Sequence, residues 1–135
     1  MFHTSKTSVI PILAATAWLC VCPTSSWSLS VEPGSGPGAL IPTGATWSYF
    51  KGTEAPSDAP GAWRQNSFDD AAWDSGQAGF GYGDEDDATP LGDMRDNYAT
   101  VYIRHEFDLS SPPADLPLEL SVDYDDGFVA YLNGV

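Results

Sequence analysis

The sequence predicts an all-β protein built as an antiparallel β-sandwich, on three observations. Apolar residues alternate with polar ones along several short segments, turn residues separate these segments, and no window carries a helical apolar stripe of useful length. Alternation with a period of two is typical of a strand that is buried on one face. Short strands spaced by turns, with almost no helix, favour two sheets packed face to face.

The first 28 residues have the layout of a secretory signal peptide. A polar start containing Lys6 precedes the apolar run from Val9 to Cys22, and small polar residues follow up to Ser28. The alternative is a membrane anchor, but this run has 14 residues and contains Pro11, whereas a spanning helix needs about 20 apolar residues. We therefore expect cleavage after Ser28, an extracellular protein, and no membrane segment after cleavage.

The charge of the remaining chain limits its partners. Both cysteines, Cys20 and Cys22, lie in the segment to be removed, so the processed chain has no thiol chemistry. All 19 acidic residues remain against four basic ones, which gives a net charge of −15. Nucleic acid and anionic lipid are disfavoured as partners because both need a basic surface. Solubility explains the acidity most simply, and divalent-cation binding is the more specific interpretation.

The processed chain divides into a lead-in at 29–43 and a module at 44–135. The lead-in is rich in Gly and Pro, which is typical of a flexible segment. Residues 46–51, "TWSYFK", alternate and begin the first strand of the module. We expect the stretch 67–76, "SFDDAAWDSG", to form one helical turn capped by Ser67 or Asp69.

Three further strands are predicted in the second half. The segment 98–109 alternates strictly and places one set of side chains toward the core, namely Val101, Ile103, His105, Phe107 and Leu109. The opposite set is polar or amphipathic and is expected to face solvent: Tyr102, Arg104, Glu106 and Asp108. Prolines bar 110–117 from a central strand. The segment 116–124 alternates again, and we expect Leu118, Leu120 and Val122 on its inner face to join the same core. The stretch 127–134 is apolar on both faces, so we expect a central strand there.

The pair Asn133-Gly134 is a strong signal for a type I′ hairpin turn, because such a turn needs positive φ at both central positions. Only Val135 follows in the sequence. A strand that is apolar on both faces should not be left unpaired. We therefore expect the β-sandwich to be incomplete at the C-terminus, in an N-terminal fragment of a larger secreted protein, with downstream domains of the same chain as partners. The alternative is a true end with an edge strand.

A search for catalytic residues finds no catalytic group and no certain cofactor. There is no G-x-S-x-G motif, and His105 is the single histidine after processing, so neither a catalytic triad nor a zinc site can be assembled. Its place on the apolar face of a strand predicts a packed core histidine. "GFGYGD" at 79–84 is not a dinucleotide fingerprint, because Asp84 replaces the third glycine and no helix follows. The sequence therefore predicts that the chain is not an enzyme.

Two acidic clusters are candidate calcium sites, since calcium prefers six to eight oxygens from flexible loops. The first is the run 84–87, with Asp84, Asp86 and Asp87 as the expected ligands, and it follows three closely spaced glycines. The second contains Asp123, Asp125 and Asp126, with Asp125 and Asp126 as the expected ligands. It does not fit an EF-hand loop that starts at Asp123, because the glycine comes one position early. The simpler interpretation of each cluster is a solvated loop end. Trp63 is a candidate ligand-binding residue, because sugars stack on exposed aromatic faces.

Five motifs follow one another in a distinctive order. They are "WSY" on the first strand, "FDDAAWDSG" at 68–76, "GYGD" at 81–84, "YIRHEF" at 102–107 and "DDGFVAYLNG" at 125–134. In this order they resemble the galactose-binding-domain-like, jelly-roll β-sandwich modules of large secreted proteins. The resemblance covers about Thr46 to Val135. These modules accompany glycoside hydrolase and metallophosphoesterase regions, among others. The resemblance implies a non-catalytic extracellular accessory module that binds carbohydrate or serves as a scaffold.

Other functions stay open from the sequence. The chain is alternatively the leader of a secreted hydrolase, of metallophosphoesterase or glycoside hydrolase type, whose catalytic part lies outside these residues. A weaker resemblance to calcium-dependent adhesin modules rests on an Asp-Asp-Gly before a strand that ends in a turn, and it implies Asp125 and Asp126 as the calcium ligands. A purely structural module would have no ligand.

Overall fold

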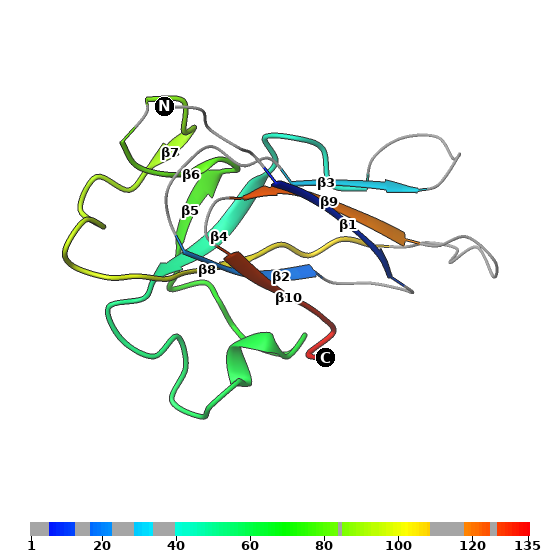
Figure 1. Ribbon diagram of the computed structural model, residues 1–135. Helices are drawn as coiled ribbons and strands as arrows, with labels where there is room; N and C mark the ends of the chain where they lie inside the picture. The colour runs from blue at the N-terminus through cyan, green and yellow to red at the C-terminus, as the bar shows by residue number, and fades with distance from the viewer. Residues whose placement is uncertain are drawn as a thin grey trace.

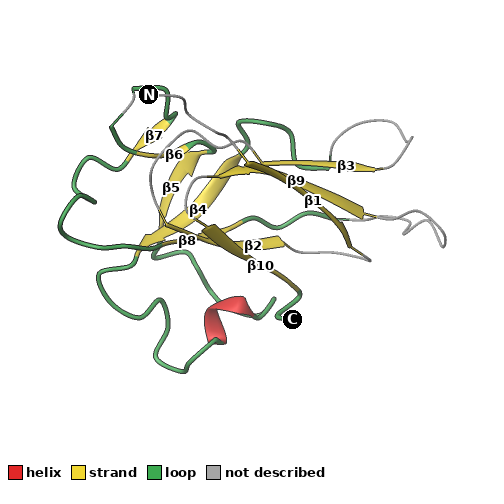
Figure 2. Ribbon diagram, viewed as in Figure 1, coloured by secondary structure: helices red, strands yellow, loops and turns green. Residues whose placement is uncertain are grey.

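The computed structural model describes residues 6–12, 17–22, 29–33, 40–83, 85–108, 118–124 and 127–135. Within these residues the protein is all-β, as predicted, with one short 3-10 turn and no α-helix (Figure 2). The 3-10 turn is η1 (Ala62–Arg64), and the strands are β1 (Lys6–Ile12), β2 (Ala17–Cys22), β3 (Leu29–Pro33), β4 (Thr46–Lys51), β5 (Asp74–Gln77), β6 (Phe80–Gly81), β7 (Thr89–Pro90), β8 (Val101–Arg104), β9 (Leu118–Tyr124) and β10 (Gly127–Leu132).

The strands form two antiparallel sheets and one short pair. The smaller sheet has the order β1-β9-β3, and the larger sheet has the order β10-β2-β8-β4-β5. The short pair β6-β7 is parallel. In Figure 1 the strands of the smaller sheet run together above β8, β2 and β10 of the larger one.

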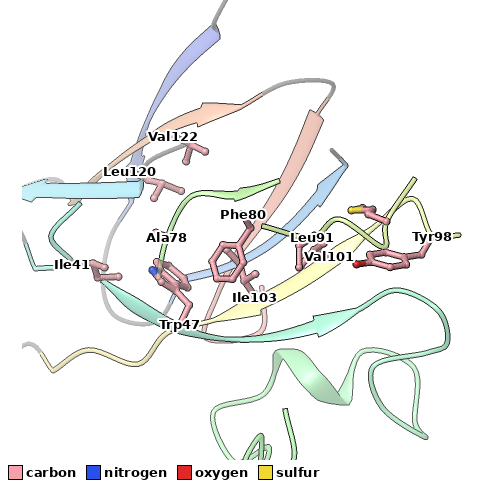
Figure 3. Close-up of a cluster of buried hydrophobic side chains, with 11 residues drawn as sticks. Ile41, Trp47, Ala78, Phe80, Leu91, Tyr98, Val101, Ile103, Leu120 and Val122 are labelled. Atoms are coloured by element: carbon pink, nitrogen blue, oxygen red, sulfur yellow. The ribbon is translucent and has the colours of Figure 1, made fainter. Parts of the chain in front are cut away.

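One hydrophobic core receives side chains from both sheets. Leu120 and Val122 of β9 belong to the same buried cluster as Trp47 of β4 and as Val101 and Ile103 of β8. Figure 3 shows these side chains converging, with Ile41, Phe80, Leu91 and Tyr98 contributed by loops and by β6. The prediction that Val101, Ile103, Leu120 and Val122 face the core is therefore confirmed. Phe107 is half-buried against the cluster, and the side chain of Leu118 lies outside the described residues.

The strand predicted over 98–109 is shorter in the structure. β8 covers Val101–Arg104 alone, and 105–108 carry no strand. Both neighbours of β8 stop pairing at its last residue, because Arg104 is the final partner of β2 and of β4. Without a neighbour, the backbone beyond Arg104 has no ladder to extend. The alternation thus predicted correctly which side chains of β8 share a face, but it predicted a strand longer than the one observed.

The helical turn predicted over 67–76 does not form. The 3-10 turn lies earlier, at Ala62–Arg64, and Asp74–Gln77 becomes β5 because it pairs with β4. Asp69 does cap a turn, since its Oδ1 accepts a hydrogen bond from the Ala71 N–H at 3.0 Å. An aspartate that bonds two residues ahead favours a turn as readily as a helix start.

The Asn133-Gly134 turn is confirmed. Asn133 has φ 51° and Gly134 has φ 89°, and Leu132 and Val135 exchange both backbone hydrogen bonds, at 2.8 and 3.1 Å. This is the two-residue loop that a type I′ hairpin requires. The prediction of a central strand at 127–134 was wrong, because β10 lies at the edge of the larger sheet and ends at Leu132.

The described residues of the N-terminal third include three strands. β1 and β2 lie within residues 1–28, the predicted signal peptide, and β3 lies in the predicted flexible lead-in 29–43. β1 and β3 flank β9 on its two edges, and β2 lies between β8 and β10. Pro11 and Pro33 lie in β1 and β3, the edge strands of their sheet, where proline is tolerated. No helix among the described residues has the length and apolar character needed to cross a membrane.

Candidate functional site

A polar pocket lies where β8 ends beside β4. It encloses about 270 Å³ and is lined by Thr46, Ser48, Asp70, Arg104, His105 and Glu106. β4 supplies the two hydroxyl residues, and the end of β8 with the residues after it supplies Arg104, His105 and Glu106. Asp70 comes from the turn that precedes β5. The lining therefore combines hydroxyl groups, carboxylates and an imidazole, and few apolar groups.

Arg104 is the buried cation beneath this pocket, and its side chain is fully covered. Its guanidinium donates to the Phe68 carbonyl at 2.8 Å and forms ion pairs with Asp70 and Glu106 at 3.4 Å each. It also lies over the Phe68 ring, 5.2 Å from its centroid. Burial lowers the pKa of Arg104, and the two carboxylates partly offset this. The residue keeps its charge, because the arginine guanidinium is not deprotonated in proteins.

The burial of Arg104 contradicts the sequence prediction that its face of the strand is open to solvent. That face of β8 is covered by the segment 62–73 instead. Trp63 contacts Tyr102 with ring centroids 5.0 Å apart, and Phe68 accepts the Arg104 hydrogen bond. The alternation in the sequence identifies the two faces of β8 correctly, but it carries no sign that a distant segment covers the second one.

His105 is half-buried at the pocket wall. Its Nδ1 donates to the Thr46 carbonyl at 2.9 Å, and its ring packs on Trp47 with centroids 4.9 Å apart. The backbone pairing of β4 with β8 ends at Arg104. The imidazole of the next residue, His105, adds one more hydrogen bond between the two segments. The prediction of a packed histidine holds for its contact with Trp47, and the polar contact with Thr46 was not predicted.

Trp63, the candidate sugar-stacking residue, is 6% exposed. Tyr102 and Tyr131 pack against it edge-to-face, with ring centroids 5.0 and 5.7 Å away. Arg64 covers the outer side of Tyr131 at 4.5 Å from the ring centroid. Trp63 thus packs the segment 62–73 onto the larger sheet, and its ring is not an open platform in this structure.

The first acidic cluster is described in part. Asp84 lies outside the described residues, Asp86 is exposed, and both carboxylate oxygens of Asp87 are buried next to Gly81. The backbone is left-handed at Gly83 and at Glu85, with φ 112° and 66°. Arg95 lies near this loop, with its guanidinium 5.4 Å from the Tyr82 ring centroid. An arginine beside the loop supplies part of the positive charge that adjacent carboxylates require.

The second cluster cannot be compared with the structure, because Asp125 and Asp126 lie outside the described residues. Among the residues that are described, no three His, Cys, Asp or Glu side chains come together in an arrangement that could hold a metal ion. Asp84, Asp125 and Asp126 lie outside the described residues, and calcium binding by either cluster stays a prediction.

A separate ion pair, Lys51 with Asp93, connects β4 to the loop before β8. The Lys51 ammonium donates to Asp93 at 2.8 Å, and the Tyr98 hydroxyl donates to the other oxygen of Asp93 at 3.0 Å. The contact with Lys51 lowers the pKa of Asp93 and raises that of Lys51. Burial, and then the hydrogen bond to Asp93, raise the pKa of Tyr98. Because Lys51 and Asp93 are substantially exposed, we expect the pair to contribute only about 0–1 kcal/mol.

The pocket residues were mostly missed by sequence reasoning. Asp70 and Glu106 are two of 19 acidic residues, and nothing in their local sequence distinguishes them from the others. Arg104 offered the one usable signal, a cation inside the most regular strand pattern of the chain. Comparison with protein-family models, with curated proteins and with solved structures finds no match to this chain.

Proposed function

We propose that this chain is a non-catalytic, extracellular accessory module with a galactose-binding-domain-like β-sandwich fold, and that it binds carbohydrate in the pocket at the end of β8. The observation that carries the proposal is the pocket lining, in which hydroxyls, an imidazole and two carboxylates face the same small space. Each sugar hydroxyl both donates and accepts hydrogen bonds, so it is suited to a lining that offers both kinds of partner. The shared core of the two antiparallel sheets supports the sandwich part of the proposal.

The electrostatics of the pocket favour binding over hydrolysis. Asp70 and Glu106 both form ion pairs with the Arg104 guanidinium. A glycoside hydrolase needs one of its two carboxyl groups protonated, so that it can donate a proton to the leaving group. Here both carboxyl groups contact the same guanidinium, so the geometry does not set one apart as the proton donor. Their oxygens instead offer hydrogen-bond acceptors to ligand hydroxyls.

A glycan array probed with the full chain, followed by calorimetric titration of the strongest glycan, tests this function. We expect Glu106→Ala to weaken binding by at least tenfold, because a hydrogen bond to a charged group contributes about 1.5–3 kcal/mol. Glu54→Ala is the matched control, since Glu54 is exposed and does not line the pocket. Glu106 is itself 68% exposed, so its loss should leave the fold intact. An array without any bound glycan, or equal affinities for the two variants, would contradict the proposal and favour a scaffold role.

We also propose calcium binding at the loop of Asp84, Asp86 and Asp87. The specific support is the buried carboxylate of Asp87 next to Gly81, within a loop that has two left-handed positions. A site that binds the folded state alone, at about 100 times its dissociation constant, adds about 2.7 kcal/mol of stability. We therefore expect millimolar calcium to raise the melting temperature, and Asp87→Asn to abolish that rise. An unchanged melting temperature with calcium and with chelator would identify the loop as ordinary solvated surface.

A further inference from the structure

We infer that the space between β8 and β10 is an acceptor site for a single extended strand, which is filled by residues 17–22 in the full chain and is open to a strand from another polypeptide after cleavage. β2 pairs with β10 over six residues and with β8 over four, antiparallel on both sides. It is thus an interior strand, although it lies in the segment that the sequence predicts to be removed after Ser28. The inference rests on that predicted cleavage and not on carbohydrate binding.

Cleavage would affect the two N-terminal strands differently. β1 is at the edge of its sheet, so its loss exposes one edge of β9. The loss of β2 instead separates β10 from the other strands of its sheet and exposes two facing edges. Adjacent strands lie about 4.8 Å apart, so the gap would measure about 9–10 Å, the width of one inserted strand. The N–H and C=O groups along both edges would then lack partners.

The walls of this gap define the chemistry of its occupant. On the core side, Val101 and Ile103 of β8 and Phe128 and Ala130 of β10 belong to the central cluster or pack against it. On the outer side, Trp63 contacts both Tyr102 of β8 and Tyr131 of β10, so one indole spans the gap. The occupant is therefore an extended segment of about six residues, apolar on both faces and antiparallel to β8 and β10.

A strand that follows the Asn133-Gly134 turn cannot fill this gap. The N–H and C=O groups of Leu132 are both bonded to Val135, and in a ladder these two groups of one residue point to the same edge. Ala17 is also opposite Leu132 in the β2 ladder, so Val135 must lie along the other edge of β10. Because neither β2 nor the strand after this turn is then available, the gap in the cleaved chain takes a strand from a second polypeptide.

The experiment starts from the full chain with a protease site inserted between Ser25 and Ser26. After folding and cleavage, urea and gel filtration remove the N-terminal fragment, and the remaining chain is refolded with a labelled peptide of residues 15–24 carrying terminal lysines. The uncut chain, taken through the same urea cycle, is the refolding control. The matched control peptide has Leu19→Pro, which removes a ladder hydrogen bond at the centre of the strand.

We expect one equivalent of the unmodified peptide to co-elute and to restore the β-sheet circular dichroism signal, with at least tenfold tighter binding than the Leu19→Pro peptide. Three results would overturn the inference. The first is refolding without any peptide, which would show that the gap closes on its own. The second is equal binding of the two peptides. The third is failure of both peptides to restore the sheet although the uncut chain refolds.

Discussion

Residues 29–135, expressed alone, are expected to lose the cooperative unfolding transition that the full chain shows. The truncation removes β1 and the interior strand β2, so β10 no longer pairs with any strand of the larger sheet. The core then loses the strand that holds Phe128 and Ala130 against Val101 and Ile103. An apolar strand with unpaired backbone groups on both edges favours aggregation over folding.

Urea titration of both proteins, followed by far-ultraviolet circular dichroism, checks this expectation. The full chain should give one sigmoidal transition, as small single domains do. The truncated chain should give a broad, shallow curve with a reduced m-value, since less surface is buried in its starting state. An equal midpoint and an equal m-value for the two proteins would show that β1 and β2 contribute nothing to the fold.

Replacement of Arg104 by alanine is expected to destabilise the full chain by about 3–5 kcal/mol, the range for breaking a buried ion pair. The change removes a fully covered side chain, leaves the Phe68 carbonyl without its donor, and leaves Asp70 and Glu106 without their shared cation. Arg104→Lys should recover only part of the loss, because an ammonium group lacks the planar fork that reaches three oxygen acceptors.

The matched control is Arg95→Ala, which removes the same charge from an exposed position over Tyr82. Its effect should stay within about 0.5 kcal/mol, as is usual at the surface. Chemical denaturation of the three variants beside the full chain gives the comparison. If Arg104→Ala and Arg95→Ala lower the free energy of unfolding by the same amount, then Arg104 does not hold the segment 62–73 on β8. The pocket would then not depend on Arg104 for its structure.

The sequence predicted well the features that depend on local pattern. Alternation located β4 and β9 and the inward faces of Val101, Ile103, Leu120 and Val122, because a period of two assigns faces without knowledge of neighbours. The turn at Asn133-Gly134 was equally accessible, since few residue pairs tolerate positive φ at both positions. These features require information from no more than a few adjacent residues.

The features that the sequence did not predict depend on distant partners. β8 stops at Arg104 because β2 and β4 stop pairing there, and β5 forms at Asp74–Gln77 because β4 lies beside it. The pocket joins residues near position 46 with others near 70 and 105, which share no motif. Composition also described 29–33 as a flexible lead-in, whereas the open edge of β9 pairs with it as a strand.

The acceptor gap and the folding of the truncated chain both depend on the strand order β10-β2-β8-β4-β5 of the larger sheet. Cys20 lies directly opposite Val129 in the β2-β10 ladder, and opposed residues of an antiparallel pair have Cα atoms about 4.5–5.5 Å apart, within the range that a disulfide spans. The measurement is oxidation of the full chain carrying Cys22→Ser and Val129→Cys, with Ala130→Cys replacing Val129→Cys in the control. We expect the Val129→Cys chain to form an intramolecular disulfide rapidly, and the Ala130→Cys control to form little of this disulfide. Equal crosslinking of both chains, or none in either, would contradict the strand order.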